Sequence, residues 1–259
     1  MRFAEVAGFL AALLFLGMLG LLEVGRRIGA HRIARDGNTA LAGAGAVDAA
    51  VFAILGLLLA FTFSGAAVRF EERRSLIVDE ANAIGTAYLR LDLLEDGARN
   101  ELRALFGRYV DARLGAYSKL PDVEAAYAEV ALSARLQEEM WRRSVAASGA
   151  RSDTAAFMLL LPALNEAFDI ASTRMAATEQ HPPEVIFGMV AFFALMSAML
   201  VGVAMASGRT RAWTHTLTFA AIISVTFFVI LDLEYPRFGL IRVDKADHLL
   251  TDLRRQMPP

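Results

Sequence analysis

Cysteine is absent from the 259-residue sequence, which excludes disulfide bonds, thiolate metal sites and a cysteine nucleophile. An excess of charge of one sign is also lacking. The chain has 26 lysine and arginine residues against 28 aspartate and glutamate residues, for a net charge of −2. A chain this close to neutral has no overall basic field to attract nucleic acid.

Catalytic and phosphate-binding motifs are missing as well. The sequence contains no Walker loop and no GxGxxG, GxSxG or HExxH pattern. Its four histidines stand far apart in the sequence and without ligand spacing, so no metal site is expected from them. We therefore predict no enzymatic activity and no cofactor.

Long hydrophobic runs are what the sequence does contain. Hydrophobic residues make up 56% of the chain, the mean hydropathy is +0.44, and the charges lie mostly between the runs. A bilayer core needs about 20 apolar residues in a helix. Four runs meet this length: Phe3–Val24, Val47–Val68, Val185–Ala206 and Trp213–Leu231. The pattern excludes a water-soluble enzyme and predicts an integral membrane protein whose first partner is the lipid bilayer.

The polar segment between the second and third runs has the periodicity of amphipathic helices and no strand alternation. No proline interrupts Val47–Leu94, so the second run is predicted to continue beyond the membrane as one helix. The predicted fold class is all-α: a four-span helical membrane protein with a long second helix extending into an extramembrane helical bundle. The predicted divisions are a first transmembrane helix pair (1–68), an extramembrane helical domain (69–184), a second transmembrane pair (185–232) and a C-terminal segment packing on the bundle (233–259).

The orientation in the membrane depends on arginines. Two short loops, Gly25–Ala46 and Ser207–Ala212, carry six arginines and one aspartate, which places these loops in the cytoplasm and the long polar segment outside. Five further arginines crowd the opposite membrane face, namely Arg69, Arg73, Arg74, Arg237 and Arg242. The sequence therefore leaves the orientation open.

Three polar groups are candidates for function. Near the end of the second run, the hydroxyls of Thr62 and Ser64 either bond their own helix backbone or line an ion pathway, where the ring of Phe63 would form a constriction. A charge cluster follows the run and is either a solvated membrane anchor or a selectivity ring at a pore mouth: Arg69, Glu71, Glu72, Arg73 and Arg74. Four polar residues beside apolar helix stripes belong either to ion pairs with nearby arginines or to an ion site: Glu80, Asn82, Asp232 and Glu234.

Three segments carry a family resemblance. Residues 66–74 (AAVRFEERR), 80–92 (EANAIGTAYLRLD) and 232–242 (DLEYPRFGLIR) resemble the bacterial family that carries a bestrophin-like domain, and the resemblance covers nearly the whole chain. That family distantly resembles bestrophins, which are pentameric chloride channels whose second span lines the pore and extends into a helical domain. The acidic calcium clasp of bestrophins has no residue-by-residue match here, and their neck motif is matched only approximately by Leu55, Leu59 and Phe63.

The resemblance implies a homo-oligomer, a pentamer if it extends that far, that conducts inorganic ions across a bacterial inner membrane. Leu55 and Leu59 would then join Thr62, Phe63 and Ser64 in lining the pore. The resemblance favours anions and a cytoplasmic helical domain, whereas the 14 basic and 19 acidic residues between Arg69 and Glu184 favour cations. The alternative is a non-conducting scaffold or sensor whose helical domain binds a partner or lipid. A secondary transporter is disfavoured because no span carries a charge at mid-membrane.

Overall fold

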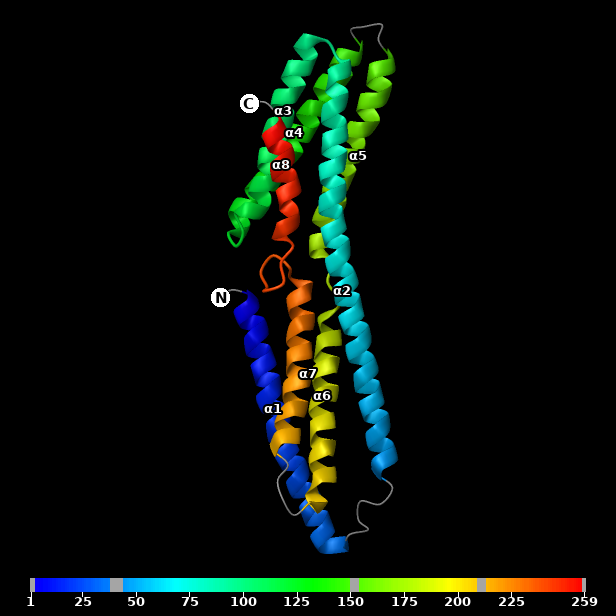
Figure 1. The fold of residues 1–259 in the computed structure, drawn as a ribbon, viewed down its shortest axis with the longest axis vertical. Coiled ribbons are helices and arrows are strands. Elements are labelled where there is room, and N and C mark those ends of the chain that lie inside the picture. Colours follow the sequence, from blue (N-terminus) through cyan, green and yellow to red (C-terminus); the bar gives the residue numbers. More distant parts are fainter. Residues whose placement is uncertain (1–2, 38–43, 150–153, 209–212, 258–259) are drawn as a thin grey trace. The chain divides into compact units, whose positions relative to one another are not determined.

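The computed structural model describes residues 3–37, 44–149, 154–208 and 213–257, and every regular element within these ranges is a helix (Figure 1). In chain order the helices are α1 (Phe3–Asp36), α2 (Ala44–Arg90), α3 (Asp96–Ser118), α4 (Val123–Gly149), α5 (Thr154–Glu179), α6 (Glu184–Ala204), α7 (Trp213–Glu234) and α8 (His248–Gln256). Short 3-10 turns lie at Leu91–Leu93, Met205–Ser207 and Asp244–Asp247. Four helical segments are long and apolar enough to cross a membrane. The predicted all-α, four-span fold class is confirmed.

Helix α2 runs from the second apolar run into the polar segment without a break, over 47 residues. At 1.5 Å per residue this corresponds to about 70 Å. Most of its buried residues recur every three or four positions, apart from one step of seven after Ala66 and two adjacent pairs near the end, and so form a stripe along the helix. These buried residues are Leu55, Leu59, Thr62, Ala66, Arg73, Ile77, Glu80, Ala83, Ile84, Ala87 and Tyr88. The predicted single long helix is therefore confirmed.

One predicted loop is wrong. Residues 25–46 were expected to connect the first two spans, but α1 continues to Asp36, so Arg26, Arg27, Arg32 and Arg35 lie on a helix. Glu23 supports this extension through ion pairs with Arg26 and Arg27, at 3.3 Å and 3.1 Å. Gly25 and Gly29 do not end the helix, and both lie at a close contact with α6, described below.

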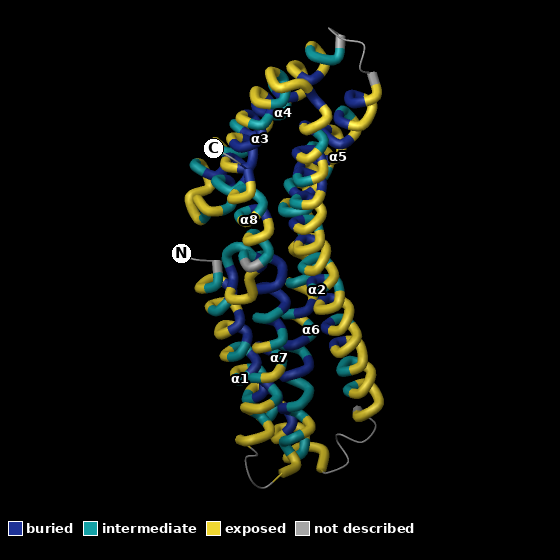
Figure 2. The backbone as a smooth tube through the Cα atoms, turned by 45° about the horizontal axis from the view of Figure 1, so that its top comes forward, coloured by how far each residue is buried: buried dark blue, intermediate teal, exposed yellow. Residues whose placement is uncertain are grey.

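The chain divides into two compact units. Unit 1 comprises Met1–Phe70 and His181–Ile241, and unit 2 comprises Glu71–Gln180 and Arg242–Pro259. Helix α2 contributes its first part to unit 1 and its remainder to unit 2. Figure 2 shows buried positions along each helix alternating with exposed ones, which is the pattern expected when each helix packs through one stripe.

In unit 1, α1 and α6 approach each other so closely that side chains are excluded between them. A Cβ atom at Gly25 would collide with the carbonyl oxygen of Met199, and one at Gly202 would collide with that of Leu22. Glycine and other small residues permit such backbone contact between membrane helices. Met18 and Ala194 belong to the buried apolar core of this unit, as do Leu55 and Leu59 of α2.

In unit 2, the core gathers around aromatic side chains. The rings of Tyr88, Phe106, Tyr109 and Phe168 form successive edge-to-face contacts with centroids 5.9 to 6.5 Å apart. Leu250 of α8 is fully buried in the same cluster. Helix α8 also pairs with α3 through Arg254 and Asp111, at 2.8 Å.

Candidate functional site

The apolar part of α2 has one packed face and one exposed face. Leu55 and Leu59 lie in the core of unit 1, and Thr62 is only 9% exposed. The hydroxyl of Thr62 donates a hydrogen bond to the carbonyl oxygen of Leu58 at 2.6 Å, one turn earlier in the same helix. These three residues therefore face the interior of unit 1.

Phe63 and Ser64 lie on the exposed face of the same helix. The side chain of Phe63 is 43% exposed, and Ser64 is exposed as well. Along this face they follow Ala53, Gly56 and Ala60, which are also exposed. Of the five residues predicted to line a pore, two thus lie on the exposed surface of the helix. The pore role of all five stays a prediction.

The charge cluster after the span does not act as one group. Arg69 belongs to unit 1 and pairs with Glu234 of α7, where its Nε lies 3.1 Å from each carboxylate oxygen. Arg74 pairs with Glu71 at 3.4 Å along the surface of α2, and the side chain of Glu72 is exposed. Surface pairs of this kind contribute little to stability.

Arg73 has a different role from the rest of the cluster. It is buried, and its guanidinium donates hydrogen bonds to the carbonyl oxygens of Ala177 and Gln180, at 2.9 Å and 2.8 Å. These carbonyls lie at the C-terminal end of α5, where a helix leaves acceptors unsatisfied and favours positive charge. Arg73 therefore caps α5. Its role at a pore mouth stays a prediction.

Glu234 is one of two fully enclosed acids among the described residues of unit 1, the other being Asp232. Glu234 has no exposed surface and is paired with Arg69. His181 lies beside it, with Nδ1 3.7 Å from Glu234 Oε2, and the imidazole ring stacks on Tyr235 at a centroid distance of 4.4 Å. A buried carboxylate needs such partners, because an isolated buried charge is strongly unfavourable.

Asp232, two residues earlier in α7, closes the turn that follows this helix. Its carboxylate accepts hydrogen bonds from the backbone N–H groups of Leu240, at 2.8 Å, and Ile241, at 2.7 Å. Gly239 is required at this turn, because a Cβ atom there would overlap the carboxylate. The oxygens of Asp232 are thus bonded to backbone N–H groups.

In unit 2, Glu80 is the centre of a buried ion-pair network that joins four elements. Arg113 of α3 donates its Nε–H to one carboxylate oxygen at 2.5 Å, and Arg174 of α5 donates to the other. Arg174 also bonds Asp247, in the turn before α8, at 2.8 Å, and its guanidinium lies 4.0 Å from the ring centroid of Tyr117. The two acids and two arginines together carry no net charge.

Burial and charge act in opposite directions on Glu80. Burial by itself raises the pKa of this carboxyl, but the two guanidinium groups outweigh it and lower the pKa below its usual value. Nearby, burial raises the pKa of Tyr109 to about 12, and its hydroxyl accepts a hydrogen bond from the amide of Gln137 at 3.1 Å. Glu80 is therefore an ionised member of a neutral network, an arrangement that offers no excess charge to a passing ion.

The remaining polar candidate, Asn82, is exposed on the surface of α2. Several partners of Glu80 and Glu234 were not among the predicted site residues. They are Arg113, Arg174 and His181, and Asp247 pairs with Arg174. A signal for two of them exists in the sequence. Arg113 and Arg174 fall on apolar helix stripes, three residues after Val110 and Ala171, and an arginine in such a stripe requires a buried acid.

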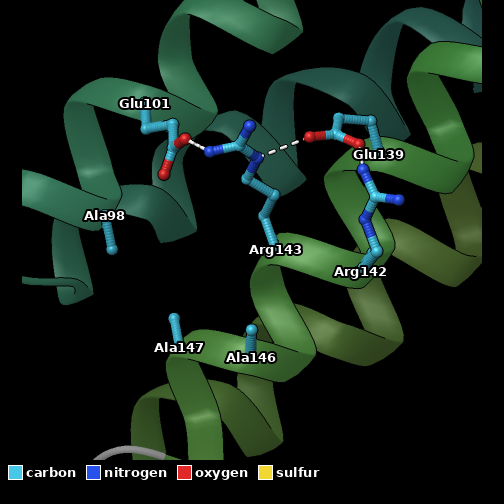
Figure 3. Close-up of a pocket in the computed structure, with 7 residues that line it drawn as sticks. All are labelled: Ala98, Glu101, Glu139, Arg142, Arg143, Ala146 and Ala147. Atoms are coloured by element: carbon cyan, nitrogen blue, oxygen red, sulfur yellow. Dashed lines mark hydrogen bonds and ion pairs between the residues drawn. The ribbon is translucent and has the colours of Figure 1, made fainter.

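A hollow of about 550 Å³ lies between α3 and α4 (Figure 3). Small side chains line part of it, and the remainder consists of Glu101, Glu139, Arg142 and Arg143. Arg143 pairs with both glutamates, with its Nε 2.6 Å from Glu139, and Arg142 pairs with Glu139. Each charge is satisfied by a neighbour, so this hollow is a weak candidate for ligand binding. Within the described ranges, no group of three or more histidine or acidic side chains is placed to hold a metal ion.

The chain was compared with protein-family models, curated protein sequences and solved structures. The family model of the Bestrophin-like domain matches residues 12–247. A comparison with curated protein sequences finds no match. Among solved structures, a single-residue variant of a bacterial bestrophin homologue from Klebsiella pneumoniae has a TM-score of 0.63 at 16% identity, covering 92% of this chain and 98% of that one. A second structure of a bestrophin homologue from this organism has a TM-score of 0.62 at 16% identity, covering 93% and 98%.

At these identities the solved structures are similar in fold, and they cover nearly the full length of both chains. The family match rests on a separate comparison and extends over most of the sequence, from the first span to the turn before α8. It confirms the resemblance seen in residues 66–74, 80–92 and 232–242. The chain belongs to the Bestrophin-like domain family.

Proposed function

We propose that the chain is the subunit of a homo-oligomeric ion channel in a bacterial inner membrane, and that the exposed face of α2 lines its pore. The observation that carries this proposal is the two-faced span of α2. One face packs into the core of unit 1 through Leu55, Leu59 and Thr62. The opposite face is exposed and carries large apolar side chains such as Leu57 and Phe61, together with small side chains and the hydroxyl of Ser64. Membership of the Bestrophin-like domain family supports the same conclusion.

The path for ions would lie between subunits. Apolar side chains such as Leu59, Ala198 and Phe227 fill the spanning core of unit 1, so the described residues of this unit offer no continuous polar route. Several copies of α2 around an axis would bring Ala60, Phe63 and Ser64 together. Phenyl rings then form a constriction that excludes water when narrow, and hydroxyls offer ions partners. A pentamer follows from the family resemblance.

The sign of the conducted ion would depend on charges next to this face. Arg69 and Arg73 are engaged within their own units, whereas the carboxylate of Glu72 is exposed. Exposed acids at a pore mouth raise the local concentration of cations. The family resemblance favours anions instead, so Glu72→Gln is an informative substitution: it should reduce cation permeability if Glu72 lies at the mouth.

The test is ion flux in liposomes that contain the purified full-length chain. Ser64→Phe should reduce flux at least tenfold by blocking the path, and Phe63→Ala should increase it by widening the constriction. Phe192→Ala is the matched control, because Phe192 is a 56%-exposed phenylalanine on α6 that does not belong to the proposed lining. Reversal potentials under chloride and potassium gradients give the ion sign.

Two outcomes would contradict the proposal. Flux that responds equally to Phe63→Ala and Phe192→Ala would remove α2 from the pore. A stable oligomer without flux at varied pH and calcium would instead favour the scaffold or sensor alternative. The assembled mass, measured in mild detergent, should be a multiple of 28.1 kDa.

A further inference from the structure

We propose that the C-terminal end of α1 binds the headgroup of an anionic phospholipid. A hollow of about 630 Å³ opens along this part of the helix. It is lined by Arg27, Ile28, His31, Arg32, Arg35 and Asp36. They form two adjacent series with a spacing of four residues, at 27, 31 and 35 and at 28, 32 and 36, and therefore share one helix face. The feature lies within unit 1 and is separate from the proposed pore face on α2.

The face carries positive charge that its own carboxylates only partly neutralise. Between Glu23 and Asp36 the sequence has four arginines and two acids, which leaves an excess of two positive charges. Glu23 is shared between Arg26 and Arg27, and the Arg27 side chain remains 79% exposed. Arg35 pairs with Asp36 but is 76% exposed, and no ion-pair partner of Arg32 is present among the described residues.

Packing against α6 places this basic face at the membrane boundary. A Cβ atom at Gly25 would collide with the backbone at Met199, and one at Gly29 would collide with Val203 and Ala206. Helix α6 ends at Ala204, at the end of its apolar run. The arginines that follow Gly25 therefore lie level with the end of this span, where lipid phosphates are found.

An exposed apolar track leads along α1 to the basic face. Phe9, Leu13, Leu16, Val24 and Ile28 are 40–67% exposed and recur every three or four residues, apart from one gap at Gly20. Nothing lies within 4 Å of a Cβ atom built at Gly20, so the track is open there as well. An acyl chain can lie along this track while its phosphate reaches the guanidinium groups.

The combination selects a lipid over a soluble anion. An apolar track in register with a cationic face matches the two halves of a phospholipid, whereas free phosphate would use the arginines alone. Arginine suits this ligand because its planar fork binds two phosphate oxygens at once. The excess of two positive charges favours anionic over zwitterionic headgroups.

The experiment is native mass spectrometry of the full-length protein, released from mild detergent with equal amounts of phosphatidylglycerol and phosphatidylcholine of the same acyl composition. The wild-type chain should retain phosphatidylglycerol preferentially. The Arg32→Gln/Arg35→Gln variant should weaken this retention roughly 30-fold, since each arginine near an anionic headgroup contributes about a fivefold factor.

The matched control is Arg142→Gln/Arg255→Gln, which removes two arginines of unit 2 whose side chains are each 75% exposed. It should leave lipid retention at the wild-type level. Equal retention of the two lipids by the wild-type chain, or an equal loss in both double variants, would overturn the proposal. Displacement of phosphatidylglycerol by millimolar inorganic phosphate would overturn it too, because the acyl chain would then contribute nothing. Unchanged melting temperatures in all variants would exclude misfolding as the cause.

Discussion

Glu80 shows at the scale of one residue how burial and charge combine in this chain. Its carboxylate is fully buried, and Arg113 and Arg174 compensate for the lost hydration. The arginines lower its pKa below the value of 4.5 that applies to an exposed glutamate. The folded chain therefore holds this proton less tightly than the unfolded chain. The resulting stabilisation is present above about pH 4.5 and is lost as the pH falls through the folded-state pKa.

Glu80→Gln should lower the free energy of unfolding at neutral pH by about 3–5 kcal/mol, because two buried guanidinium groups lose their shared counter-charge. The difference from wild type should shrink as the pH falls below about 4.5, where the wild-type stabilisation is itself lost. Thermal melting in detergent, followed by circular dichroism at several pH values, measures both effects. Glu124→Gln, at an exposed position on α4, serves as the control and should have little effect. If the loss of unfolding free energy caused by Glu80→Gln did not change with pH, the conclusion that Glu80 is ionised in the folded chain would be wrong.

The sequence predicted which buried side chains need partners, but it did not predict which residues those partners are. Glu80, Asp232 and Glu234 could be selected because polar groups beside apolar stripes need partners. Their partners could not be identified, because Arg69 and Glu234 are 165 positions apart in the chain, and Arg174 and Glu80 are 94 apart. Periodicity determines which face a residue occupies, but pairing over such separations depends on how the helices are arranged.

At the scale of helices, the close contact between α1 and α6 depends on Gly25, Gly29 and Gly202. At these three positions a side chain would meet the backbone of the other helix. Backbone atoms cannot move aside as the end of a flexible side chain can. Helix α1 remains helical through two glycines of this contact, which were expected to lie in a loop.

Gly202→Ala should destabilise unit 1 by about 1–3 kcal/mol, since the added methyl group overpacks a backbone contact. Gly20→Ala is the matched control on α1, where nothing lies within 4 Å of the new Cβ atom. It should be neutral or slightly stabilising, because alanine favours a helix more than glycine does. Melting temperatures of the two variants in the same detergent make the comparison. Equal effects would show that the two helices are less tightly packed than described.

Helices were the most predictable part of the structure. Hydrophobic runs and periodicity predicted the spans and the long α2, because burial in lipid or in a core requires these patterns. The extension of α1 to Asp36 was missed for a physical reason. Arginine and glycine were taken as the end of the span, but the end of an apolar run is not the end of a helix when backbone hydrogen bonds continue into water.

At the scale of the whole chain, each unit is built from two separate stretches of the sequence. Residues 242–259 join unit 2, although all of α6 and α7 precede them. Leu250 occupies the core of that unit with no exposed surface, beside residues of α2 and α3. The core of unit 2 is therefore complete only when α8 has been made.

Leu250→Ala should destabilise unit 2 by about 2–5 kcal/mol through the cavity it leaves. The neighbouring substitution Leu249→Ala changes a 44%-exposed leucine on the same helix and should have little effect. Limited proteolysis reports the difference, because α3 and α4 should be cleaved faster only in the first variant. If both variants were cleaved equally, α8 would not be part of the core.

Within unit 2, the buried stripe of α2 that contains Glu80, Ala83 and Ala87 depends on an unbroken helical phase. Each residue of an α-helix turns the chain by about 100°. One residue inserted between Glu80 and Ala83 would rotate Ala83 and Ala87 by that angle relative to the carboxylate that Arg113 and Arg174 bind. Seven inserted residues would restore the phase to within about 20° while lengthening the helix by about two turns. Insertions and deletions in this part of α2 are therefore constrained by angle more strictly than by length.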